Sequence, residues 1–218
     1  MFLILFFSSI SGYSQSSAWY NDAVSKIENT SSLPPQERIP ILSQYLTVGG
    51  FTGKPPTGFR RNNVEDQQVF EKAQSALLVI PGHAEFFMKP IEDTYERLAQ
   101  NKFDTEPPKI AGDLVDVGRV FQMLSQLPSP ETVKVLGEFM VNDKVMDAWM
   151  EETKNVTSEE QHDRLSVNPP LGPQAAYAIN FLPLKSKPVK EWDYSGYDDV
   201  RKWRNWYQQI KDGRVVPH

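Results

Sequence analysis

The stretch SQLPSPETVKVLGEFM, residues 125–140, indicates a turn between two helices. Apolar residues recur at three- and four-residue spacing before and inside it, which is the pattern of one buried helix face. Leu127-Pro128 ends the first helix, because proline breaks helical backbone. Ser129 can cap the second helix, Pro130 suits its first turn, and Glu131 complements its positive N-terminal end. The first apolar face comprises Leu114, Val117, Val120, Phe121 and Leu124, and the second comprises Val133, Leu136, Phe139 and Met140.

The same pattern stands near the start of the chain. Residues 31–46, SSLPPQERIPILSQYL, align with residues 125–140 without a gap. Ile80-Pro81 and Leu182-Pro183 also follow helical apolar runs, so apolar-Pro turns begin at positions 33, 80, 127 and 182, with steps of 47, 47 and 55 residues. A nearly constant step of this size predicts an all-α fold of stacked antiparallel helical hairpins. The apolar positions matched in residues 31–46 are Ile39, Leu42, Tyr45 and Leu46.

These residues carry a resemblance to a known class of repeats. A helix ending in a Pro-containing turn, followed by Pro-Glu-x-Val-x-x-Leu, resembles the HEAT and armadillo class of α-solenoid repeats. DDVRKW, residues 198–203, is similar to the Asp-x-Val-Arg opening of the second helix in such repeats, and DVGRVF, residues 116–121, is a looser version. The resemblance covers residues 18–212 in patches. It implies a HEAT-like α-α superhelix whose function is to bind other proteins.

The composition of the 218-residue chain excludes several kinds of site. There are no cysteines, so disulfides, thiolate zinc sites and cysteine nucleophiles are excluded. The net charge of -5 argues against a nucleic-acid partner, since nucleic-acid-binding domains are usually basic. We expect another protein as the partner and expect no cofactor.

The first residues, MFLILFFSSISGYSQSSA, differ from the polar remainder. A short apolar core is followed by small residues at Gly12 and Ser14, which suit the positions before a signal-peptidase cut. We therefore predict a signal peptide at residues 1–16, a single all-α repeat domain at residues 17–218, and a secreted or periplasmic location. If the apolar run is instead an ordinary buried segment, the protein is cytoplasmic. We expect no integral membrane segment after signal removal, because a spanning helix needs about 20 apolar residues.

The Gly- and Pro-rich stretch VGGFTGKPPTGFRRNN, residues 48–63, is the first candidate binding site. GGFTGK fails as a phosphate loop, because the first glycine of that motif falls on Val48 and Pro55 replaces the required Ser or Thr. Aromatic and basic residues favour interfaces, and insertions in repeat arrays gather on one edge. The alternative is a solvated connector. The predicted partner-binding residues are Phe51, Lys54, Phe59, Arg60 and Arg61.

The C-terminal aromatics give a second candidate site. Trp203, Trp206 and Tyr207 lie at helical spacing and are predicted to cover the core. The stretch before them also carries aromatic rings, which suit stacking on sugars. The alternative function is therefore that of a carbohydrate-binding accessory protein. Its predicted sugar-stacking residues are Trp192, Tyr194 and Tyr197.

No catalytic or metal-binding pattern stands out. The three histidines, His83, His162 and His218, lie far apart, with no HExxH spacing, and there is no G-x-S-x-G elbow. A capping or exposed position is expected for His83. Scattered carboxylates would support a hydrolase only in a cleft that shifts their pKa values. We therefore expect no metal site and a non-enzymatic, exported protein-binding or scaffold module.

Overall fold

The computed structural model describes residues 17–46, 64–100, 118–144, 146–147, 151, 171–189 and 197–215, and it leaves the side chains of residues 93–100 and 197–199 undescribed. Within these ranges the chain is helical and forms no strand, which confirms the predicted all-α class. Residues 118–124 are helical as well. The named helices are α1 (Ala18–Asn29), the 3-10 helix η1 (Thr30–Ser32), α2 (Pro35–Ser43), α3 (Val64–Leu78), α4 (His83–Gln100), α6 (Pro130–Val141), α9 (Gly172–Phe181) and α10 (Tyr197–Lys211).

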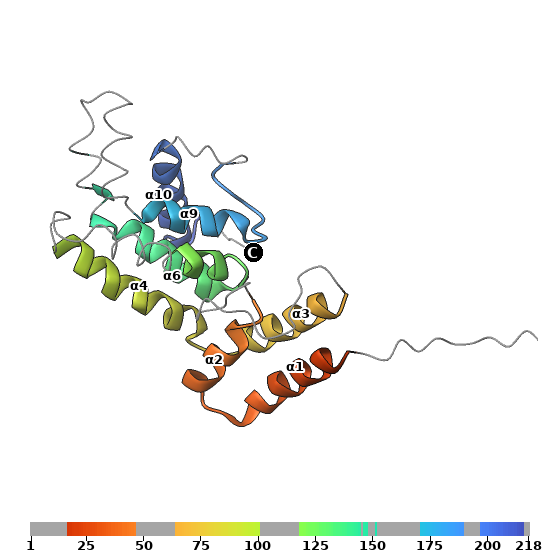
Figure 1. The fold of residues 1–218 in the computed structure, drawn as a ribbon. Helices are drawn as coiled ribbons and strands as arrows, with labels where there is room; N and C mark the ends of the chain where they lie inside the picture. Colours follow the sequence, from red (N-terminus) through yellow and green to blue (C-terminus); the bar gives the residue numbers. More distant parts are fainter. Residues whose placement is uncertain are drawn as a thin grey trace, which may run out of the picture.

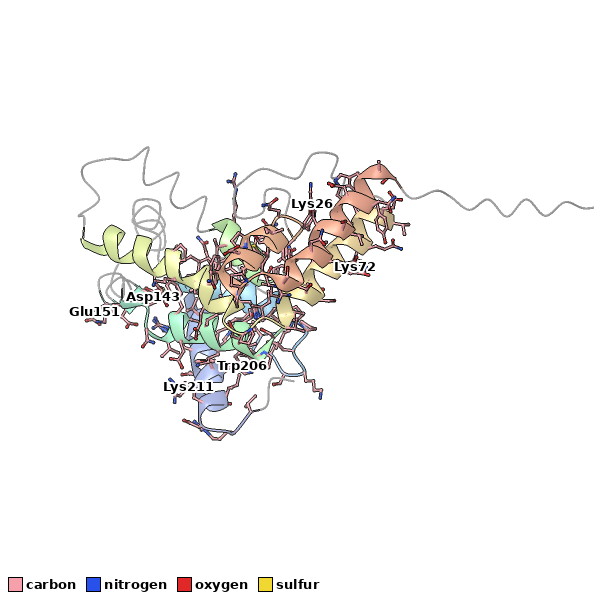
Figure 2. All side chains as sticks on the ribbon, turned by 90° about the horizontal axis from the view of Figure 1, so that it is seen from below. Lys26, Lys72, Asp143, Glu151, Trp206 and Lys211 are labelled. Carbon is pink, nitrogen blue, oxygen red and sulfur yellow. The ribbon has the colours of Figure 1, made fainter. Side chains whose placement is uncertain are left out.

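The helices pack mainly on helices close to them in the chain. Figure 1 shows α1, α2 and α3 at one end of the molecule, α9 and α10 at the other, and α4 and α6 between them. Helix α3 contacts α1 and α2, α2 contacts α4, and α4 contacts α6, which contacts α9 and α10. Figure 2 shows Lys26 and Lys72 at the first end, with Glu151 and Lys211 at the second. The apolar core therefore runs from one end of the molecule to the other.

Three of the four predicted turns join two helices. Leu33-Pro34 joins η1 to α2, Ile80-Pro81 joins α3 to α4, and Leu127-Pro128 joins the helix at 118–124 to α6. The fourth, Leu182-Pro183, follows the end of α9, but residues 183–189 are not helical. Prolines at 183 and 188 provide the reason, since proline lacks the N–H that continues a helix.

The apolar positions that match between the two copies of the sequence repeat are buried in both copies. All eight matched apolar positions are buried, with exposed fractions of 0–8%. The polar positions of the two copies differ, because Pro35 stands where Ser129 caps α6, and α2 has no side-chain cap. Pro40 lies inside α2, where it leaves the helix continuous to Ser43. The matched buried residues are Ile39, Leu42, Tyr45, Leu46, Val133, Leu136, Phe139 and Met140.

Asp143 fixes the position of α9. One carboxylate oxygen accepts from Met146 N at 2.9 Å, and the other accepts from Gly172 N, the first residue of α9, at 2.7 Å. A Cβ on Gly172 would lie 2.8 Å from Asp143 Oδ2, so only glycine permits this approach. Arg204 of α10 donates to Met140 O at 2.8 Å and to Asp143 O at 3.1 Å. Asp143 and Arg204 thus link α6, α9 and α10. The Arg204 cation is favoured at this place because the C-terminal end of a helix carries a partial negative charge.

Helix α10 covers the core with the aromatic face that the sequence predicts. Trp203, Trp206 and Tyr207 are buried, and the two indole rings meet edge to face at 5.1 Å. Tyr207 packs directly on Gly137 of α6, where an added Cβ would lie 2.3 Å from the phenol ring. The Tyr207 hydroxyl donates to Glu138 Oε1 at 3.1 Å, and burial raises the pKa of Tyr207 well above its ordinary value. The absence of a side chain at residue 137 thus sets the close approach of α10.

We predict that Gly137→Ala destabilises the protein. Alanine gains about 1 kcal/mol in helix propensity, whereas overpacking costs about 1–3 kcal/mol and the hydroxyl bond prevents Tyr207 from swinging aside. The expected net loss is up to about 2 kcal/mol in urea unfolding followed by circular dichroism. In a Tyr207→Leu background the same change should cost less. Equal effects in both backgrounds would contradict the contact.

A second prediction concerns acid stability. Glu138 accepts from Lys211 Nζ, and this bond holds the pKa of the carboxyl below its ordinary value of 4.5. A carboxyl with a depressed folded pKa stabilises the protein above the unfolded pKa, and that stability is lost as pH falls through the folded pKa. Wild type should therefore exceed Glu138→Gln in unfolding free energy at pH 6, by at most about 1 kcal/mol because the pair is partly exposed. The difference should shrink below pH 4.5. A difference that is constant with pH would refute this role.

Candidate functional site

The residues predicted from sequence as binding sites lie outside the described residues. The stretch 48–63 and both aromatics before 197 are among the undescribed parts, and Tyr197 begins α10 with its side chain undescribed. The two predicted sites thus remain predictions. The first predicted site comprises Phe51, Lys54, Phe59, Arg60 and Arg61, and the second comprises Trp192, Tyr194 and Tyr197.

A groove lies between residues 118–126 and α9, and we call it the α9 groove. Its volume is about 600 Å³. Phe121 is buried at its base, while Phe181 stands 57% exposed at the end of α9 and packs edge to face on Tyr177 at 4.6 Å. None of the described residues that line it is charged, although 23% of the chain is. The aromatic and amide side chains that line the groove are Phe121, Gln122, Gln126, Gln174, Tyr177 and Phe181.

The polar side chains of the α9 groove are uncharged amides and hydroxyls. Gln126 is anchored because Gln74 Nε2 donates to its main-chain oxygen at 2.5 Å. Its side-chain oxygen Oε1 has no hydrogen-bond partner among the described residues. Gln122 and Gln174 also line the groove, so aromatic faces stand beside groups that can both donate and accept. The α9 groove can therefore hold an uncharged segment that carries its own amide groups.

Sequence patterns did not indicate this groove, for a reason visible in α9. The helical apolar run before Leu182-Pro183 contains Ala175, Ala176, Ala178 and Ile179, and all four are buried. Tyr177 and Phe181, four residues apart, lie off that face and meet on the surface. An aromatic pair at this spacing, outside the apolar stripe, was the available signal. The opposing helix at 118–124 could not be matched with it from sequence.

A second groove, the α1–α2 groove, lies between those two helices. Its volume is about 640 Å³. Asp22 and Lys26 form an ion pair at 2.7 Å along its edge, and Tyr45 is buried except for 3% of its surface. The polar and aromatic lining comprises Trp19, Asp22, Lys26, Asn29, Gln44 and Tyr45, together with the hydroxyl-bearing Thr30.

His83 belongs to a cluster of hydrogen-bonded side chains with Ser129 and Glu131, which we call the α4–α6 joint. The ring is 2% exposed, so the predicted solvent exposure of His83 is wrong. Its Nδ1 lies 2.8 Å from Ile80 O, which can only accept, so Nδ1 carries a proton. Its Nε2 lies 3.0 Å from Ser129 Oγ. Glu131 accepts from Ala84 N at 2.7 Å and from Gly82 N at 3.1 Å.

Ser129, His83 and Glu131 stand in the order of a hydrolase triad, with Glu131 Oε2 3.4 Å from His83 Nδ1. A hydrogen bond and the burial of Ser129 favour a structural role. Ser129 Oγ accepts from Thr132 N at 3.0 Å and so caps α6, and Ser129 is only 7% exposed. Neither groove includes this cluster. A nucleophile must reach a substrate, so we assign the three residues to joining α4 and α6.

In the part of the chain that the structure describes, no group of three or more His, Asp or Glu side chains is placed to hold a metal ion. Of the helices described, none is both long enough and apolar enough to cross a membrane.

No known protein family, curated protein or solved structure matches this chain. Its function is therefore argued from its own residues.

We predict that Glu131→Ala destabilises the protein by about 1–3 kcal/mol, because Ala84 N–H and Gly82 N–H lose their acceptor at a buried joint. Chemical unfolding measures the change. Glu37→Ala is the matched control, since Glu37 occupies the same position in the first copy of the repeat and is exposed. The control should change stability by no more than about 0.5 kcal/mol. Equal losses would show that Glu131 acts only through the dipole of its own helix.

Proposed function

We propose that this chain is a non-enzymatic, exported protein-binding or scaffold module, built as a HEAT-like stack of helical hairpins. Three Pro-containing turns that join helices, with contacts that advance along the chain, support the stack. The apolar run at residues 1–16 supports export to a secreted or periplasmic location. Stacked helical hairpins expose long surfaces, and such surfaces serve mainly to bind partners.

The α9 groove is the observation that carries the proposal. Interfaces are depleted of charge at their centre and enriched in aromatic residues, and both properties meet here. The exposed Phe181 ring supplies an apolar contact, and the side-chain amides of Gln122 and Gln174 in the lining supply hydrogen-bonding groups. The occupant that fits is a protein segment with an apolar side chain and an unpaired main-chain N–H. Such a segment gains burial of its side chain and a hydrogen bond in one step.

The sequence suggests that a second surface contributes. Phe51, Phe59 and Arg60, with Lys54 and Arg61, belong to the stretch 48–63, which would add basic and aromatic contacts to an acidic chain. The partner would then meet an uncharged groove and a basic segment of the same protein.

The proposal is tested with a random peptide library displayed on phage and panned against the full chain. Recovered peptides should share an apolar or aromatic residue and carry little charge. Fluorescence anisotropy with a synthetic copy of a recovered peptide should show at least about tenfold weaker binding to Phe181→Ser, the equivalent of about 1.4 kcal/mol.

The matched control is Val79→Ser. Val79 is 73% exposed and follows α3, outside both grooves, so the change removes another exposed apolar side chain from a different place. This variant should bind as wild type does. If the peptides bind Phe181→Ser and Val79→Ser equally well, or if only charged peptides are recovered, the α9 groove is not the binding site.

A further inference from the structure

The α1–α2 groove presents polar side chains in a regular row. Asp22, Lys26 and Asn29 follow one another at four- and three-residue spacing, so they stand on one face of α1. Gln44 and Tyr45, at the end of α2, line the other side. Because both walls belong to helices that pack on α3, the row is held in a fixed register.

The charges of this groove cancel. Asp22 and Lys26 are its charged side chains among the described residues, and they pair at 2.7 Å. The hydrogen bond that Lys26 donates to Asp22 raises the pKa of Lys26, so the ammonium stays protonated through the physiological range. Both side chains are 60% exposed, and a charged ligand would be attracted by one of them and repelled by the other at nearly the same place. The groove therefore favours a neutral ligand.

The hydrogen-bonding groups are of both kinds. The Asp22 carboxylate accepts, the Lys26 ammonium donates, and the amides of Asn29 and Gln44 do both. A ligand that satisfies this set carries several groups that donate and accept at once. Hydroxyl groups do so, and adjacent hydroxyls match the two atoms of a carboxylate or an amide.

One accessible aromatic ring completes the site. Tyr45 also lines the groove, but it is 3% exposed and serves as part of the wall, where burial raises the pKa of its hydroxyl and keeps it protonated. Trp19 lines the groove one turn before Asp22 on α1. An aromatic face packs on C–H groups, while a polar rim satisfies hydroxyls. The volume, about 640 Å³, lies within the range of small-molecule sites.

We propose that the α1–α2 groove binds a neutral saccharide, with a sugar ring against Trp19 and hydroxyls bonded to the row from Asp22 to Asn29 and to Gln44. The α9 groove does not share this chemistry, since it has two phenylalanine rings and no ionised group in its described lining. The saccharide site is independent of the proposed protein-binding function and lies on different helices.

The test titrates the full chain with cellohexaose, xylohexaose, mannohexaose and maltohexaose. Isothermal titration calorimetry measures affinity, and the Trp19 indole N–H is followed by nuclear magnetic resonance. At least one hexasaccharide should bind and shift the Trp19 signal. Asn29→Ala and Gln44→Ala should each weaken that binding at least about fivefold, since each removes a hydrogen-bonding amide. Circular dichroism confirms that the variants fold.

Asn205→Ala is the control, because Asn205 is an exposed amide on α10 and its loss should leave binding unchanged. A hexamer of galacturonic acid tests neutrality and should bind more weakly than the neutral sugars. The proposal is overturned if none of the four neutral hexasaccharides binds at about 1 mM. It is also overturned if both groove variants bind as wild type does, or if the uronic acid binds more tightly.

Discussion

Where helices pack end to side, their first N–H groups lose water and need another acceptor, and this constraint shapes the molecule. The chain meets it with carboxylates supplied from other segments. Glu131 accepts from Ala84 N at the start of α4, and Asp143 accepts from the first residue of α9. At an exposed position, Glu65 of α3 accepts in the same way from Ser17 N, the cap of α1, at 2.8 Å. Each bond satisfies a donor and also fixes one helix against another. The joints are therefore specific in a way that apolar burial is not, since burial is non-directional.

The position of α9 follows from these joints, and the α9 groove follows from the position of α9. Asp143 holds the start of α9, and Gly172 allows the approach. At the other side of α6, Gly137 lets Tyr207 bring α10 close, so α6 is covered by both helices. The alanine-rich face of α9 packs in the core, and its aromatic pair lines the groove beside the helix at 118–124. An uncharged recess on a charged chain is the consequence.

The two grooves differ in the chemistry that they offer. The α9 groove joins aromatic rings to neutral amides, which suits a protein segment. The α1–α2 groove joins aromatic rings to a cancelled ion pair and amides, which suits a neutral sugar. A module with both could hold a protein partner while attached to a saccharide. The triad-like order of Ser129, His83 and Glu131 shows why geometry must be read together with access, since all three are already used in joining helices.

Local sequence determined the helical class, three inter-helix turns and the buried face of each matched helix, because the spacing of apolar residues and the placement of proline act within one or two turns. It did not determine the partner of Glu131. Glu37 holds the same position in the repeat, yet it is exposed, whereas Glu131 meets residues 47 and 49 positions earlier. The grooves were likewise beyond reach, because Phe121 and Phe181 become neighbours only when α9 docks. Helix propensity depends on residues close together in the sequence. The joints between helices and the grooves depend on distances between separate segments, and only the tertiary packing of α4, α6 and α9 decides these distances.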